Sequence, residues 1–142
     1  MKFMLDTNIC SYIIKRKPLE VLEKFRTLDM DDCCISSVTS AELRYWVARN
    51  NRLHHKSGNL GNPSINGQIV GQFLAHLPVL DFDSHAALVY GRVRDELESR
   101  GIIVGGMDLL IGSHALSLNL ILVTNNTKDF VNFPDMYLEN WV

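Results

Sequence analysis

The sequence has few of the features that mark secreted, membrane or disulfide-rich proteins. It contains 3 cysteines in 142 residues, and two of them, Cys33 and Cys34, are adjacent. An odd number of cysteines, two of them adjacent, does not form a disulfide framework. We therefore expect Cys10, Cys33 and Cys34 to be reduced residues of the core. The late apolar run Leu120–Val123 is far too short to span a bilayer. The opening run reaches Asp6 before a secretion signal could form, which predicts a cytoplasmic protein.

An excess of charge of one sign is also missing. The chain has 14 Lys and Arg, 16 Asp and Glu, and a formal net charge of -2. No global positive field would attract it to nucleic acid, so any such role needs a local patch. Its 46% hydrophobic and 21% charged residues are ordinary globular values. The length predicts one domain over residues 1–142.

Short apolar runs alternate with helical patterns along the chain. Several of these runs are apolar throughout, which favours a parallel sheet covered by helices on both faces, a three-layer α/β sandwich. We expect strands at 3–5, 33–36, 79–80, 120–123 and near 137–138. We expect helices over 9–17, 18–25, 39–50, 65–76, 84–100 and 107–117, and a long polar loop over 51–64.

Four acids fall where this architecture would bring them together. Asp6 directly follows the first strand, and Glu42 lies in the first turn predicted after the second. Asp108 begins the helix after a glycine pair, and Asp129 follows the last core strand. Residues that follow parallel strands collect at the carboxyl edge of the sheet, where such folds bind ligands.

Clustered carboxylates need compensation. A partly buried pair about 4 Å apart repels by about 4 kcal/mol at an effective dielectric near about 20. The 5 histidines and 3 cysteines show no zinc-ligand spacing, and oxygen ligands favour Mg²⁺ or Mn²⁺. A carboxylate-held ion of this kind suits phosphodiester hydrolysis.

Each acid also has a purely structural interpretation. Asp6 could cap a helix, and Glu42 could complete a capping box with Thr39. Asp108 suits the dipole of a first helical turn, and Asp129 could be an ordinary surface acid. From spacing alone the metal site and the capping roles stay open.

Four motifs resemble those of PIN-domain ribonucleases, and among them the VapC-type toxins of toxin–antitoxin pairs. They are Met4–Asn8, Ser36–Leu43, Asp108–Ala115 and Leu122–Phe130. The resemblance covers nearly the whole chain and implies the PIN-like sandwich with a mostly parallel sheet.

The resemblance also implies site residues and partners. Asp6, Glu42 and Asp108 match an acidic triad that holds Mg²⁺ or Mn²⁺, and Asp129 matches a more variable fourth acid. Small polar residues match the surroundings of the site, namely Asn8, Thr124 and Asn126. The implied activity is that of an endoribonuclease acting on RNA. The family's targets are the anticodon loop of initiator tRNA in some members and ribosomal RNA in others, and tRNA is the expected target here. A homodimer and a VapB-type antitoxin are the implied partners.

Local positive charge lies beyond Glu42. Arg44, Arg49, Arg52 and Lys56 are candidates for RNA contact, although a solvated helix end explains them as well. Tyr12, Tyr45 and Trp46 could line an interface or stack on bases, and core or dimer packing is the favoured interpretation. We interpret His114 as a packing or partner-contact residue that binds no metal.

Three other functions remain open at this level. One is a PIN-fold RNA-processing or structure-specific nuclease that has no antitoxin. Another is a phosphatase with an aspartate nucleophile, which the absence of a second acid two residues after Asp6 weakens. The last is a non-enzymatic interaction module whose acids only cap helices.

Overall fold

A computed structural model describes residues 1–57 and 66–142, with the side chains of 55–57 left aside. Within these residues, parallel strands form one sheet in the order β3-β2-β1-β4-β5. The strands are β1 Phe3–Leu5, β2 Cys33–Ser36, β3 Val79–Leu80, β4 Ile121–Val123 and β5 Leu138–Glu139. Every pairing is parallel, which confirms the predicted α/β class.

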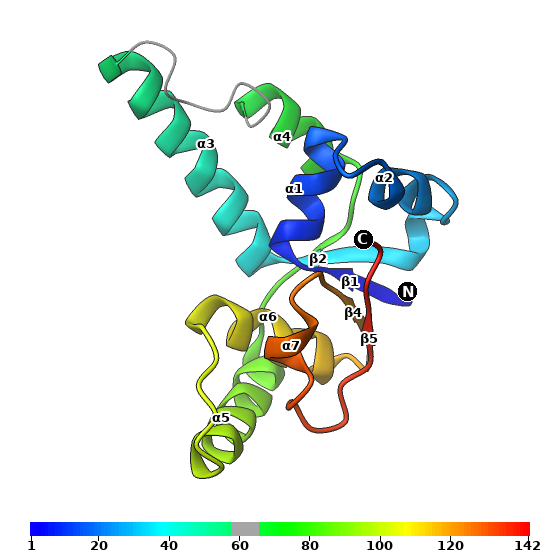
Figure 1. Ribbon diagram of the computed structural model, residues 1–142, viewed down its shortest axis with the longest axis vertical. Coiled ribbons are helices and arrows are strands. Elements are labelled where there is room, and N and C mark those ends of the chain that lie inside the picture. Colours follow the sequence, from blue (N-terminus) through cyan, green and yellow to red (C-terminus); the bar gives the residue numbers. More distant parts are fainter. Residues whose placement is uncertain (58–65) are drawn as a thin grey trace.

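Helices cover both faces of this sheet, as Figure 1 shows. One layer contains α1, α2, α3 and α4, and the other contains α5, α6 and α7. Their bounds are α1 Thr7–Lys15, α2 Leu19–Arg26, α3 Ser37–Ser57, α4 Gly67–Ala75, α5 Ser84–Ser99, α6 Gly106–Ser117 and α7 Thr127–Phe130. A 3₁₀ turn, Met30–Asp32, precedes β2. None of the described helices is both long enough and apolar enough to cross a membrane.

The pleat of the strands divides the core between the two layers. Phe3 and Leu5 of β1 pack in the α1–α4 layer, whereas Met4 packs against α5 and α6. On β2, Ile35 packs in the α1–α4 layer and Cys34 packs on the opposite face. Both faces are therefore apolar, because successive side chains of a strand point in opposite directions. All three cysteines are free and buried, as predicted.

The sheet reverses its strand order between β1 and β4. From β1 the chain continues to β2 and β3 on one side, and it later returns to add β4 and β5 on the other. The register pairs Leu5 with Val123, so Asp6 and Thr124 leave the sheet side by side. A crevice at such a reversal is the usual ligand site of open parallel sheets.

Several predicted boundaries are wrong. Helix α3 begins at Ser37 and continues to Ser57, so residues 51–57 of the predicted loop are helical, and 58–64 lie outside the described residues. Glu42 therefore lies in the second turn, and Thr39 is not a cap. Asp129 belongs to a short helix that was not predicted, α7.

His114 packs inside the protein, as predicted. It is 1% exposed, and its Nδ1 lies 2.8 Å from the Ser36 hydroxyl oxygen. Its ring meets the edge of Phe82 at a centroid distance of 5.5 Å. His114 thus connects α6 to the end of β2. Burial lowers its pKa, which favours the neutral form of the side chain.

Close packing of α6 depends on Gly112. A Cβ atom at this position would lie 2.6 Å from a ring carbon of Phe133 and 2.9 Å from one of Phe130. Both phenylalanines are buried, and Phe130 immediately follows Asp129. The missing side chain thus lets α6, which carries Asp108, approach the segment that carries Asp129.

Gly112→Ala should destabilise the protein by about 1–3 kcal/mol, because two buried rings would have to shift. Gly91→Ala is the matched control, since its added Cβ meets nothing within 4 Å in the middle of α5. That change should stabilise the protein by about 0.5–1 kcal/mol through helix propensity. Urea unfolding measures both, and equal effects would contradict the packing account.

Candidate acidic site at the carboxyl edge of the sheet

Asp6 occupies the end of β1 in a nearly closed environment. It is 3% exposed, and its Oδ1 accepts a 2.9 Å hydrogen bond from the Ile9 amide at the start of α1. The capping role is therefore real. The pKa of Asp6 is raised to about 6, chiefly by burial and also by the charges of Asp108 and Glu42, while hydrogen bonds from Thr124 and Ile9 oppose the rise.

Glu42 is held toward Asp6 by a residue that the sequence-based reasoning did not select. The Thr7 hydroxyl donates to Glu42 Oε1 at 2.6 Å, and Thr39 Oγ1 lies 3.4 Å from the same hydroxyl. Thr7 is buried at the first position of α1. Its place directly after Asp6 in the first motif was the signal that could have identified it.

Asp108 and Asp129 share one neutral donor. Asn126 Nδ2 donates to Asp108 Oδ2 at 3.3 Å and to Asp129 Oδ2 at 2.5 Å. Thr124 Oγ1 accepts a 2.9 Å hydrogen bond from the backbone N–H of Asn126, and this bond fixes the turn after β4. Desolvation, together with the charges of Asp129 and Glu42, raises the pKa of Asp108. The structure therefore brings all four predicted acids into one electrostatic cluster.

Among the described residues, no basic side chain forms an ion pair with these acids. The ion pair found in this part of the chain joins Arg94 and Glu98 on the surface of α5. The groups that donate to the acids are amides and hydroxyls, which orient carboxylates without neutralising them. The negative charge is therefore left for a ligand to compensate.

The donor set suits a hard divalent cation. It consists of carboxylate oxygens, the ligands that Mg²⁺ and Mn²⁺ prefer. In the ranges described, no three acidic, histidine or cysteine side chains are gathered closely enough to form a complete metal site.

Asn8 is the predicted polar residue that the structure does not bring to the cluster. It is exposed on the first turn of α1, and the Asp6 carboxylate is oriented by Ile9 and Thr124 instead. Thr124 and Asn126 do contact the acids, as the motifs predicted.

The candidate RNA-contact residues on α3 lie on different sides of the helix. Arg44, Arg49 and Arg52 are all exposed, and the side chain of Lys56 lies outside the described residues. At about 100° per residue, Arg49 falls on the same side of the helix as Glu42, whereas Arg44 falls about 160° away. Arg44 Nε donates to Ser40 Oγ at 3.4 Å.

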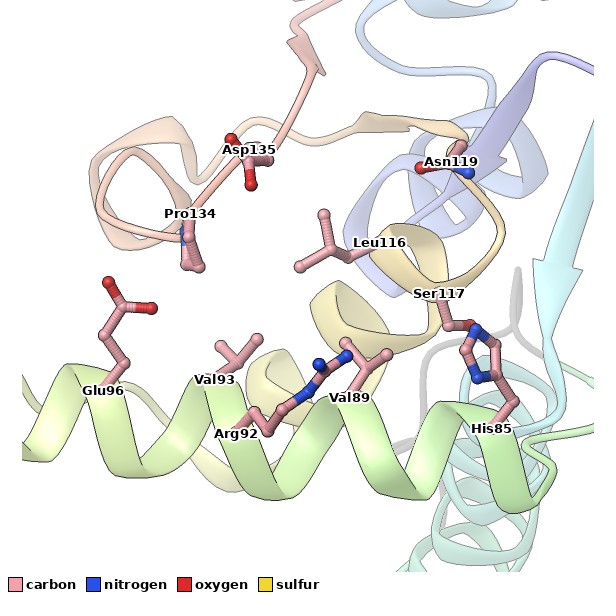
Figure 2. Close-up of a pocket in the computed structure, with 10 residues that line it drawn as sticks. All are labelled: His85, Val89, Arg92, Val93, Glu96, Leu116, Ser117, Asn119, Pro134 and Asp135. Atoms are coloured by element: carbon pink, nitrogen blue, oxygen red, sulfur yellow. The ribbon is translucent and has the colours of Figure 1, made fainter.

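A separate cavity of about 430 Å³ lies at the opposite edge of the sheet (Figure 2). It is formed by α5, the end of α6 and the turn at Pro134, and it contains Arg92 beside Val89 and Val93. Helix α6 runs from Asp108 at one edge to Ser117 at this cavity, so the acids and the cavity are separated by its length.

Comparison with known proteins agrees with this geometry. The family model described as the PIN domain matches residues 3–135. A Ribonuclease VapC2 of Rickettsia felis is 40% identical over 99% of this chain and 98% of its own. A tRNA(fMet)-specific endonuclease VapC of Shigella flexneri is 40% identical with the same coverage. The chain belongs to the PIN-domain family, in its VapC ribonuclease group.

Two solved structures of similar chains are VapBC complexes. VapBC2 from Rickettsia felis, bound to a promoter DNA fragment, matches with a TM-score of 0.83 and 38% identity over 100% of both chains. DNA-bound VapBC from Salmonella typhimurium matches with a TM-score of 0.82 and 37% identity, over 100% of this chain and 99% of that one.

Asp6→Asn should stabilise the protein in EDTA above pH 6. The pKa of Asp6 is raised from 3.8 to about 6, so ionised Asp6 lowers the free energy of unfolding by about 3 kcal/mol. Below pH 3.8 this cost is absent, because Asp6 is then protonated in both the native and the unfolded protein. The stability of the wild type should thus fall, relative to the variant, as pH rises from about 4 to 6. Urea unfolding across this range measures the difference.

Asp83→Asn is the matched control. Asp83 caps α5 by accepting from the Ala86 amide at 2.9 Å, and this bond lowers the pKa of Asp83. Ionisation therefore favours the native state there, so its amide variant should gain no stability at pH 8. A stabilised Asp83→Asn, or an Asp6→Asn effect independent of pH, would contradict the electrostatic account.

Proposed function

We propose that this protein is a Mg²⁺- or Mn²⁺-dependent endoribonuclease toxin that hydrolyses RNA phosphodiester bonds, leaving a 5′-phosphate and a 3′-hydroxyl. The observation that carries the proposal is the convergence of four acids at the strand-order reversal of a PIN-domain sheet, where no described basic side chain forms an ion pair with them. Capping alone gives no reason for this unbalanced charge.

In this proposal Asp6, Glu42 and Asp108 hold the ion, and Asp129 completes their site or a second one. When bound, the ion would supply activation of a water molecule and neutralisation of the charge that develops on the phosphate. The four acids come from the end of β1 and from α3, α6 and α7.

The other residues position these acids. Ile9 and Thr124 fix the Asp6 carboxylate, and Thr7 directs Glu42 toward it. Asn126 joins Asp108 to Asp129 through one amide group. Because every one of these donors is neutral, each can orient a carboxylate without competing for the charge that attracts the cation.

The names of the relatives suggest the substrate and the partner. A relative 40% identical is named for cleavage of tRNA(fMet), and similar chains were solved with antitoxins as VapBC complexes. We therefore propose tRNA as the substrate, with the initiator tRNA anticodon loop as its site and inhibition of translation as the result. A VapB-type antitoxin would neutralise the toxin. We also propose a homodimer that acts in the cytoplasm, where tRNA is found.

Asp6→Asn and Asp108→Asn should each lower RNA cleavage by at least about a hundredfold, because each removes a proposed metal ligand. Asp83→Asn changes an acid of the same type outside the site and should cleave at the wild-type rate. End-labelled tRNA incubated with Mn²⁺ gives the rates, and circular dichroism verifies the fold. A fully active Asp6→Asn protein would refute the assignment.

Metal binding separates this proposal from a non-enzymatic module whose acids only cap helices. A ligand that binds only the native state raises the melting temperature with concentration. Mn²⁺ should raise the Tm of the wild type and of Asp83→Asn, and it should have little effect on Asp108→Asn. Equal shifts in all three proteins, or no shift in the wild type, would favour the module.

A further inference from the structure

Positive charge is concentrated beside the acidic site, on α3. No acidic residue occurs between Glu42 and Asp81, although the whole chain carries a net charge of -2. All the Lys and Arg residues of this interval lie between Arg44 and Lys56. The helix therefore begins at an acidic cluster and continues as a locally cationic element.

The spacing of these residues places an aromatic and two cations on the side of α3 that carries Glu42. Tyr45, Arg49 and Arg52 follow Glu42 at three, seven and ten residues. This spacing keeps side chains within a narrow stripe of a helix. From Glu42 to Arg52 the stripe extends about 15 Å, the length of about four stacked nucleotides.

The stripe is open to solvent and is not needed by the core. Tyr45 is 59% exposed, so of the two roles predicted for it, core or dimer packing, the core role is wrong. Arg49 and Arg52 are exposed as well. The core is instead contacted by Leu43, which is fully buried, and by the partly buried Trp46. Figure 1 shows α3 extending outward from the end that lies beside the sheet.

We propose that Tyr45, Arg49 and Arg52 form a track for a single-stranded segment of the RNA substrate leading away from the acidic site. Tyr45, one helical turn from Glu42, stacks on a base next to the cleaved phosphate, and the two arginines contact the following phosphates. An exposed aromatic followed by cations matches the alternating bases and phosphates of a single strand. This inference rests on the proposed endoribonuclease function.

Binding measured without cleavage tests the track directly. In EDTA, a fluorescein-labelled mixed-sequence RNA oligonucleotide should bind Tyr45→Ala about tenfold more weakly than the wild type, because one stacked base is lost. The slope of log affinity against log salt should not change. Tyr45→Phe keeps the ring and should bind as the wild type does.

The arginine variants should show a different signature. Arg49→Ala and Arg52→Ala should each reduce the salt slope by about 0.7, the value for one phosphate contact with a single strand. Arg44→Ala removes the same charge from the opposite side of α3 and should leave the slope within about 0.2 of the wild type. An Arg44→Ala effect equal to that of Arg49→Ala would overturn the track in favour of general charge attraction.

Two further controls match the residue types elsewhere on the protein. Tyr137 is 69% exposed near β5, and Arg92 lies in the cavity at the far edge of the sheet. Tyr137→Ala and Arg92→Ala should bind RNA as the wild type does. Weakening by these variants equal to that by Tyr45→Ala and Arg49→Ala would contradict a localised track.

Failure of the track and failure of the proposed function give different results. If the wild type cleaves RNA in Mn²⁺ while Tyr45→Ala binds RNA normally, the track is wrong and the nuclease assignment stands. If the wild type binds RNA with the expected variant pattern but never cleaves it, the nuclease assignment is wrong and the track stands. Dissociation of a wild-type dimer by Tyr45→Ala at unchanged RNA affinity would assign the stripe to contact between two copies, against the track.

Discussion

The site depends on the fold bringing four mutually repelling carboxylates together, with no ion pair to a basic side chain among the described residues. Asp6 is nearly closed off from solvent, and its pKa is raised to about 6 by burial and by its acidic neighbours. Such a cluster of acids lowers the stability of the folded protein, so its presence indicates that the acids are kept for function. Because the surrounding donors are hydroxyls and amides, the cluster keeps its shape while its charge stays available to a cation.

The rest of the fold maintains this arrangement. Parallel strands direct Asp6 and Thr124 to the same edge, and the apolar faces of the sheet fix both helical layers around it. His114 ties α6 to β2, and Gly112 lets α6 approach the segment that ends in Phe133. Residues far from the chemistry thereby set the distance between Asp108 and Asp129. Helix α3 extends the site outward, since one helix contains Glu42 and the arginines that follow it.

Sequence patterns predicted the parts that follow from periodicity and failed where tertiary contacts decide. Apolar strands and the positions of the acids after them were enough to predict the sheet and the cluster. The capping box at Thr39 was wrong because α3 begins two residues earlier, at Ser37, so Thr39 lies inside the helix. Its hydroxyl instead contacts Thr7, a contact between α3 and α1 that local spacing does not contain. Likewise, Asn8 was expected beside Asp6, but the register of β4 brings Thr124 there instead. The polar composition of residues 51–57 suggested a loop, whereas this segment continues α3.

The central claim is that the four acids share a divalent cation. Crystals grown with Mn²⁺ and measured by anomalous diffraction test it most directly. The account predicts an anomalous peak enclosed by the carboxylates of Asp6, Glu42 and Asp108, with Asp129 beside it. Ordered carboxylates that point to separate surfaces, with no peak between them at saturating Mn²⁺, would contradict it.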